Sequence, residues 1–369
     1  MEDKIMAYNF DVICKQFQWN GEFDSIRPYG DGHINDTYLV TMQDGDQSLP
    51  YILQRVNHEI FKATEQLMEN IEKVTGYLVD YIKEHPLPNY EVLTLVPTHI
   101  GQSYYKDAEG NYWRSYEFVH NATGHLFAEN ATMLYEAGRA FGLFQYMLKD
   151  YPAETLHETI KDFHNTQQRF ENFKTVLAQD SKNRAKECRE SIDFTLQHQE
   201  ITTLILSEMA SGNIPTRVTH NDTKINNVLL DDASGKGRCV IDLDTVMPGS
   251  ALYDFGDAIR SCGSTLEEDA TNLEDMDVDL ERFEAYTKGY LEIMKDELTA
   301  KELELLPMSA IIMTFECGMR FLTDHLDGDK YFKVHKDNHN LIRAKNQYAF
   351  VKKMEEKLPL MEAIVKKYI

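Results

Sequence analysis

Polar residues suited to phosphoryl transfer gather in one stretch of the sequence, between His220 and Asp244. Within it, Asn227 follows Asp222 by five positions, and Asp242 lies two positions before Asp244. A carboxylate can accept the proton of an acceptor hydroxyl, and Mg²⁺ prefers oxygen ligands such as carboxylates and amides. We therefore predict that Asp222 is the catalytic residue. The predicted magnesium ligands are Asn227, Asp242 and Asp244.

A β-hairpin is expected to position these residues. Two apolar runs, Val228–Leu230 and Arg238–Leu243, have the composition of strands and flank a turn of sequence Asp-Ala-Ser-Gly-Lys-Gly. Because strand side chains alternate, a second strand that continued to Asp244 would direct Asp242 and Asp244 to one face. Leu243 would then point into the core.

The spacing of His220, Asp222 and Asn227 is that of a kinase catalytic loop, in which a metal-binding Asp follows after one hairpin. In this pattern the histidine orients the loop through backbone hydrogen bonds and is not the base. Lys224 allows two interpretations. It is either a cation that stabilises the transferring phosphoryl group or a solvated lysine.

Two other segments are interpreted as structural. Asp254, in the triplet Asp-Phe-Gly, begins a helix and is expected to brace the loop that carries Asp242, which already fills the metal-binding role. Residues 162–166, Asp-Phe-His-Asn-Thr, are typical of a helix cap. The alternative for that segment is a loop on the substrate side.

These motifs, with Gly249 and the sequence Tyr-Asp-Phe-Gly-Asp at 253–257, resemble the aminoglycoside phosphotransferase and choline kinase superfamily. More narrowly, the chain resembles the bacterial N-acetylhexosamine 1-kinases from about Arg27 to Gln347. The resemblance implies a bilobal protein-kinase-like fold. It also implies direct, Mg²⁺-dependent transfer of the ATP γ-phosphate to the anomeric hydroxyl of N-acetylglucosamine or N-acetylgalactosamine. The alternatives are another alcohol acceptor (an aminoglycoside, choline or a homoserine-like alcohol) and a non-catalytic nucleotide-binding module.

The fold class is predicted to be α+β, in two lobes. Residues 1–118 are the nucleotide-binding lobe, a five-stranded antiparallel sheet with one helix, and residues 119–369 are a larger, mainly helical lobe for catalysis and acceptor binding. The expected strands are Ser25–Tyr29, Thr37–Thr41, Tyr51–Val56, Val92–Pro97 and Asn111–Val119. The expected helices are Phe61–Lys83, Leu134–Leu148, Phe170–Leu177, Arg184–Met209, Leu280–Met294, Ala300–Leu326 and Leu341–Lys357.

Nucleotide contacts are expected at two places in the N-terminal lobe. Gly30 and Gly32, in the turn between the first two strands, can lay backbone N–H groups over phosphates, although an ordinary hairpin turn explains them equally well. The resemblance implies that the adenine bonds to backbone groups where the lobes join. The residues at that junction are Glu117 and Val119.

A cation is also expected to contact the nucleotide phosphates. Arg55 stands where a kinase-like fold carries its phosphate-binding lysine, and Gln54 is the alternative at this uncertain register. Kinases pair that cation with a glutamate of the neighbouring helix. Glu69 is the preferred partner, and Glu65 is the other candidate.

The acceptor is expected to contact Arg320, Asp324 and Tyr331 near the end of a long helix. Arg320 and Asp324 are four residues apart and share one helical face. Either they form a surface ion pair, or the arginine donates to sugar oxygens while the carboxylate accepts from sugar hydroxyls, with Tyr331 as an aromatic platform. His33 and Asn35, in the turn between the first two strands, are also predicted to bind the substrate.

The composition excludes several classes of partner. With 38 Lys and Arg against 61 Asp and Glu, the chain carries a formal charge of −23 and lacks the positive charge that nucleic acids or anionic membranes attract. The predicted partners are small molecules, ATP and an amino sugar, and the oligomeric state is left open. Five dispersed cysteines and no apolar run of a membrane span's length predict a cytoplasmic protein with reduced thiols.

Overall fold

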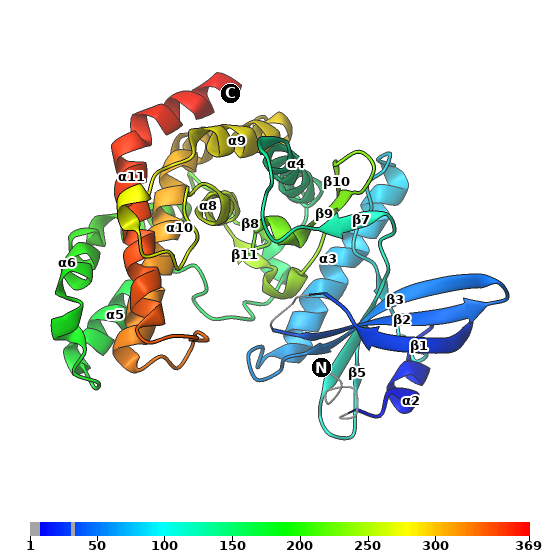
Figure 1. The fold of residues 1–369 in the computed structure, drawn as a ribbon. Helices are drawn as coiled ribbons and strands as arrows, with labels where there is room; N and C mark the ends of the chain where they lie inside the picture. Colours follow the sequence, from blue (N-terminus) through cyan, green and yellow to red (C-terminus); the bar gives the residue numbers. More distant parts are fainter. Residues whose placement is uncertain (1–7, 31–33) are drawn as a thin grey trace.

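The computed structural model describes residues 8–30 and 34–369, so two predicted site residues, Gly32 and His33, lie outside the described residues. A sheet occupies one side of the molecule and most helices lie on the other (Figure 1). The α+β fold class predicted from the sequence is confirmed. The division into lobes at residue 118 stays a prediction.

The N-terminal sheet is antiparallel and, within the described residues, has six strands rather than the predicted five. Its path runs β1 (Glu22–Pro28), β2 (Asp36–Asp44), β3 (Gln47–Val56), β6 (Tyr112–Glu117) and β4 (Leu95–Val96). The additional strand, β5 (Tyr105–Lys106), pairs with β6. A two-residue strand is too short to produce a periodic pattern, which explains why the sequence analysis missed it.

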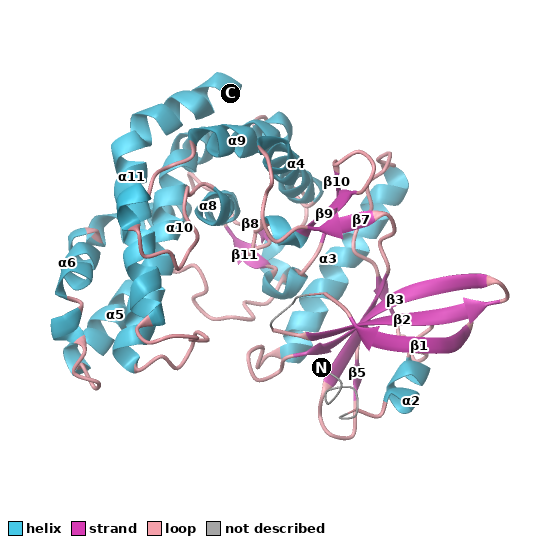
Figure 2. Cartoon of the chain, viewed as in Figure 1, coloured by secondary structure: helices cyan, strands magenta, loops and turns pink. Residues whose placement is uncertain are grey.

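Helices make up most of the remaining chain and are drawn in cyan in Figure 2. In chain order they are α2 (Phe10–Ile13), α3 (Thr64–Glu84), α4 (Ala131–Met147), α5 (Thr166–Gln179), α6 (Arg189–Gln197), α7 (Leu204–Ala210), α8 (Ala251–Cys262), α9 (Leu280–Met294), α10 (Ala300–Asp327) and α11 (His339–Tyr368). The predicted single helix Arg184–Met209 is wrong, because a 3₁₀ segment (Gln199–Thr203) separates α6 from α7. There the hydroxyl of Thr202 donates to the carbonyl of Gln199, and such local bonds compete with helical ones.

The two faces of the N-terminal sheet pack against different elements, and this decides which side chains reach the centre of the molecule. Leu53 packs with Trp113 in the smaller apolar cluster, on the face that α2 covers. Val56 belongs to the main core, which includes the apolar face of α3. Because side chains alternate along β3, Gln54 points to the α3 face and Arg55 to the α2 face.

Helix α10 runs through the middle of the helical region and packs against α5, α8 and α11. Its length and composition would suit a membrane span, but 83% of its most apolar window is buried inside the protein. It is therefore a core helix. Two small sheets, which pack against α4 and α8, hold the stretch around Asp222: β7 (Ala122–Gly124), β9 (Val228–Asp231) and β10 (Gly237–Val240) in one, and β8 (Arg217–Thr219) and β11 (Met247–Gly249) in the other.

Candidate active site

A buried carboxylate on the first turns of α8, Asp254, holds the loop that carries Asp222. Asp254 is 1% exposed and accepts hydrogen bonds from the backbone N–H groups of His220 (3.0 Å) and Asn221 (2.7 Å). The side chain of Gln145 donates a third bond at 2.7 Å. Burial raises the pKa of Asp254, while these donors stabilise its charged form and oppose the rise. The predicted structural role is confirmed, although the loop that Asp254 supports is the catalytic one.

Replacing Asp254 by Ala should lower the free energy of unfolding by about 2–4 kcal/mol, because buried donors lose their acceptor. Chemical denaturation measures the effect. The control is Glu281, an exposed acid in the first turn of α9, where Glu281→Ala should change stability by less than about 0.5 kcal/mol. Equal stability of the wild type and Asp254→Ala would contradict this role.

His220 is fully buried and bridges the two loops of the site. Its Nε2 lies 2.9 Å from the carbonyl oxygen of Ile241, and its Nδ1 accepts the backbone N–H of Asp222 at 3.3 Å. These bonds require that Nε2 carries the proton and donates to the carbonyl. The edges of Phe141 and Phe144 enclose the ring. The prediction that His220 orients the loop is confirmed.

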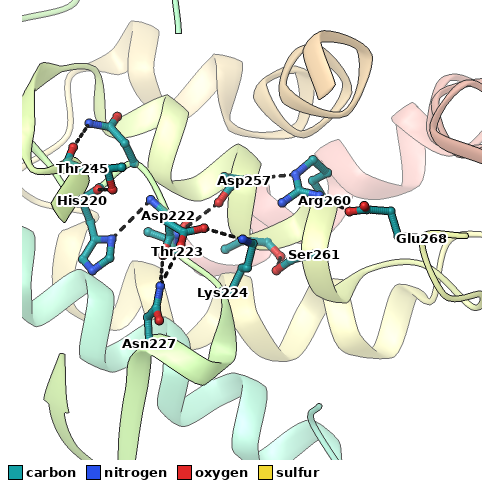
Figure 3. A network of polar contacts seen from close by, with 12 residues as sticks. His220, Asp222, Thr223, Lys224, Asn227, Thr245, Asp257, Arg260, Ser261 and Glu268 are labelled. Carbon is teal, nitrogen blue, oxygen red and sulfur yellow. Dashed lines mark hydrogen bonds and ion pairs between the residues drawn. The ribbon is translucent and has the colours of Figure 1, made fainter. Parts of the chain in front are cut away.

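Asp222 lies at the centre of a polar network that Figure 3 shows from close by. Its side chain is 29% exposed, so a substrate hydroxyl can reach it. The Lys224 ammonium lies 2.8 Å from one carboxylate oxygen, and the Asn227 amide donates to the other at 3.1 Å. Lys224 is therefore an ion-pair partner of the predicted base, and this carboxylate raises the lysine's pKa. On the far side of Thr223, Asp257 and Arg260 form a second ion pair at 2.8 Å.

The backbone around Asp242 differs from the prediction. Strand β10 ends at Val240, Asp242 has a left-handed backbone with φ +62°, and Leu243–Thr245 form one 3₁₀ turn. The predicted strand through Leu243 is therefore wrong. Aspartate adopts the left-handed region more readily than most residues, which permits the chain to turn here. A tight turn, not strand alternation, brings Asp242 and Asp244 near each other, and Leu243 is buried as expected.

The chemistry of this turn fits a magnesium ion held jointly with a nucleotide. Desolvation by the surrounding protein, with the carboxylates of Asp244 and Asp222 nearby, raises the pKa of Asp242 to about 7, although the residue keeps contact with solvent. A divalent cation would relieve this crowding of negative charge. In the part of the chain that the structure describes, no three His, Cys, Asp or Glu side chains form a metal site by themselves. Mg²⁺ commonly takes one or two protein carboxylates and completes its shell with substrate phosphates and water.

Asp244 connects this turn to the N-terminal sheet. One of its oxygens lies 2.5 Å from the guanidinium of Arg114 on β6, and the other accepts the side-chain amide of Asn35 at 2.6 Å. Asn35 also accepts the backbone N–H of Asn57 at 2.9 Å, so its predicted role in substrate binding competes with two protein contacts. The sequence analysis missed Arg114. The available signal was a cation flanked by aromatic residues in the middle of a predicted strand.

The predicted ion pair between Arg55 and Glu69 is wrong. Arg55 pairs with Asp36 at 2.6 Å, on the sheet face away from α3. Glu69 contacts Lys73 at 2.6 Å and His157 at 2.7 Å, on the outer side of α3. Glu65, the other candidate, accepts a hydrogen bond from a tyrosine hydroxyl on β6 at 3.1 Å. The prediction failed because Gln54, not Arg55, is the β3 residue on the α3 face, a register difference of one residue.

The remaining predicted nucleotide contacts, at Gly30, Glu117 and Val119, stay predictions. Gly30 has φ +74°, a conformation that glycine adopts without strain, and a Cβ added there would meet no described residue within 4 Å beyond its chain neighbours. Glu117 ends β6, and its backbone N–H donates to the carbonyl of Thr94 at 2.9 Å. Glu117 and Val119 both line a hollow beside the C-terminal turns of α3.

Arg320 on α10 lies among three aromatic rings. The centre of its guanidinium is 5.4 Å from the ring of Phe163, 5.5 Å from Phe332 and 5.8 Å from Tyr331. Tyr331 is 64% exposed, so its ring is accessible as a platform. The cluster gives the predicted acceptor region a fixed cation with aromatic walls.

Asp324 does not have the predicted role. It is 6% exposed, and its oxygens accept the backbone N–H groups of Lys330, Tyr331 and Phe332 at 2.8–2.9 Å. The side-chain amide of Asn340 donates a further bond at 2.9 Å. The prediction that Asp324 accepts from sugar hydroxyls is wrong, because these bonds fill its acceptor sites. Asp324 instead fixes the loop that presents Tyr331.

The segment 162–166 has the predicted role of a helix cap, and the alternative of a loop on the substrate side stays a prediction. The Asn165 side chain accepts the backbone N–H of Gln168 and caps α5, as the cap interpretation predicted. The preceding residue, His164, lies 2.9 Å from Glu316 of α10 through Nδ1 and 3.4 Å from the backbone oxygen of Asn221 through Nε2. The segment therefore connects the region of Arg320 to the catalytic loop.

Comparisons with known proteins concern the family and the fold of the chain. Residues 25–293 match the profile of the phosphotransferase enzyme family. Among solved structures, an aminoglycoside phosphotransferase from Alicyclobacillus acidocaldarius subsp. acidocaldarius DSM 446 is similar at TM-score 0.56 and 10% identity, covering 95% of this chain and 96% of that one. A choline kinase from Cryptosporidium parvum Iowa II has TM-score 0.54 and 11% identity, covering 98% and 94%. An ethanolamine kinase from Plasmodium vivax has TM-score 0.52 and 15% identity, covering 88% and 82%. At these identities the similarity concerns the fold alone.

Proposed function

Because this chain belongs to the phosphotransferase enzyme family, we propose that it is an ATP-dependent kinase that phosphorylates the anomeric hydroxyl of an N-acetylhexosamine. The observation that carries the proposal is the contact of Asn227 with the partly exposed carboxylate of Asp222, close to the carboxylate of Asp242. This set combines a proton acceptor with oxygen ligands, which is what phosphoryl transfer requires of a protein. The reaction is placed in the cytoplasm, as the free cysteines favour.

In the proposed mechanism, Asp222 orients the acceptor hydroxyl and takes up its proton as the new phosphorus–oxygen bond forms and the bond from the γ-phosphorus to the ADP leaving group breaks. Asn227 and Asp242 would hold Mg²⁺, which would supply positive charge against the nucleotide phosphates. Lys224 balances the charge of Asp222 before the acceptor binds. The transfer is direct and in line, so no phosphorylated residue of the enzyme is needed.

The choice of acceptor rests on Arg320. A fixed guanidinium repels cationic acceptors such as choline and aminoglycosides, whereas it can donate to the hydroxyl and acetamide oxygens of a neutral sugar. The exposed ring of Tyr331 beside it offers a surface on which the apolar face of a sugar can pack. Both features favour an N-acetylhexosamine over the alternative acceptors.

The test is ADP release from Mg-ATP with a panel of acceptors: N-acetylglucosamine, N-acetylgalactosamine, glucose, galactose, choline and kanamycin. We expect ADP with the N-acetylhexosamines and none above background with choline or kanamycin. Turnover with choline or kanamycin alone would keep the phosphotransferase assignment and overturn the acceptor. Silence with every acceptor would overturn the proposed reaction.

Replacing Arg320 by Met should raise the KM for N-acetylglucosamine by roughly tenfold to a hundredfold, because the sugar loses a charged hydrogen-bond donor. The KM for ATP should stay within about twofold. Arg282 on α9, whose ion pair with Asp279 is at the surface, provides the matched control Arg282→Met. If steady-state kinetics show an unchanged KM for the sugar, Arg320 is not an acceptor contact.

A further inference from the structure

The N-terminal sheet does not present a lysine or arginine from β3 to the site. Protein kinases contact the nucleotide phosphates with a β3 lysine, which a glutamate of the neighbouring helix holds in place. Here the β3 residue on the α3 face is Gln54, and Arg55 points to the other face, where it pairs with Asp36. The two candidate glutamates of α3, Glu65 and Glu69, are also engaged elsewhere. A kinase with this sheet needs another cation.

Arg114 stands opposite Gln54 on the neighbouring strand, β6, and shares its face of the sheet. Its Nε donates to the side-chain oxygen of Gln54 at 3.0 Å, and the amide of Gln54 donates in turn to Thr37 at 3.0 Å. Arg114 is 1% exposed, and the ring of Tyr116 lies 5.3 Å from its guanidinium. The side chain is therefore held in one orientation by contacts on several sides.

Arg114 points toward the turn that carries the predicted metal ligands. Its Nη1 lies 2.5 Å from Asp244, two residues after Asp242. A guanidinium has five N–H donors in a planar fork that matches phosphate oxygens. Among the described residues, the polar oxygen contacts of Arg114 are Gln54 and Asp244, made through Nε and Nη1, which leaves Nη2 available for a ligand.

We propose that Arg114 is the cation that binds the nucleotide phosphates in this protein, with Asp244 as the carboxylate that holds it. This ion pair takes the place of the lysine and helix glutamate of protein kinases. The inference rests on the proposed function and deepens it. In this arrangement Asp244 is the ion-pair partner of the phosphate-binding cation, and Asn227 and Asp242 remain as the protein ligands of Mg²⁺.

The test is direct binding of Mg-ADP and of adenosine, measured by calorimetry without acceptor. Arg114→Met should weaken Mg-ADP binding by roughly tenfold to a hundredfold and leave adenosine binding within about twofold, because only the phosphates lose a contact. Arg114→Lys should recover part of the affinity, since a point charge replaces the fork. Arg55→Met, the same change at the predicted position, should bind Mg-ADP as the wild type does.

The double variant Arg114→Met with Asp244→Asn guards against misfolding, because the single change leaves a buried carboxylate without its partner. We expect this folded double variant to show the same loss for Mg-ADP alone. Wild-type affinity in the Arg114 variants, or a loss in Arg55→Met instead, would overturn the inference and leave the proposed function standing. A wild-type chain that binds neither Mg-ADP nor adenosine would overturn both.

Discussion

Replacing Asp222 by Asn should lower kcat by about 10²–10⁴-fold, the range that a positioned general base contributes. The amide keeps the size of the side chain and can still contact Lys224 or Asn227, but it cannot accept the proton of the acceptor hydroxyl. Binding of Mg-ADP should stay within about twofold, because no predicted nucleotide contact is removed. Single-turnover kinetics with saturating ATP and N-acetylglucosamine measure the loss in the transfer step.

The matched control for this change is Asp232→Asn. Asp232 is exposed on the hairpin between β9 and β10, where it accepts a hydrogen bond from Thr123 at 2.8 Å. The same chemical change there should leave kcat within about twofold. Near-normal turnover of Asp222→Asn would show that Asp222 is not the base.

Replacing Asp242 by Asn should have opposite effects on activity and stability. Loss of a charged Mg²⁺ ligand should lower kcat by about a hundredfold or more, since the metal neutralises the transferring phosphates. The same change should stabilise the metal-free protein at pH 8, because it removes a carboxylate crowded by Asp244 and Asp222. A residue that costs stability but supports catalysis is expected at an active site.

The sign of the pH dependence follows from the raised pKa of Asp242, about 7 in the folded protein against an ordinary 3.8. Between these values the folded state binds more protons than the unfolded state, so the wild type loses stability as pH rises through this window. The advantage of Asp242→Asn should be small at pH 4 and grow to on the order of 1 kcal/mol at pH 8, because Asp242 is exposed and solvent screens the repulsion between the carboxylates. Urea denaturation with a metal chelator at both pH values measures it. An advantage that does not grow with pH would contradict the assigned crowding.

Local patterns in the sequence were sufficient to predict most of the fold. Helices α9 and α10 were predicted within a residue at each end, because their apolar periodicity is long and regular and because caps such as Thr299 mark their starts. The catalytic loop was recognisable for a different reason. Its residues are adjacent in the chain, so the spacing between His220, Asp222 and Asn227 alone predicts which side chains approach one another.

The parts of the site that sequence analysis did not predict depend on contacts between distant segments. Whether Gln54 or Arg55 faces the site depends on a register of one residue, which only the packing of α3 against one sheet face decides. The contact between Arg114 and Asp244 joins residues 130 positions apart and has no local signature. The prediction that Asp324 binds a ligand was wrong because its real partners are backbone N–H groups of a loop. A sequence pattern does not reveal such partners.

The most direct test of the proposed function is phosphorus NMR of a reaction containing the protein, Mg-ATP and N-acetylglucosamine. The account predicts equal amounts of ADP and of an acid-labile sugar 1-phosphate, and no sugar phosphate with Asp222→Asn. Phosphate on a different hydroxyl would contradict the anomeric assignment. Release of inorganic phosphate alone would contradict the central claim that the γ-phosphate passes to a sugar.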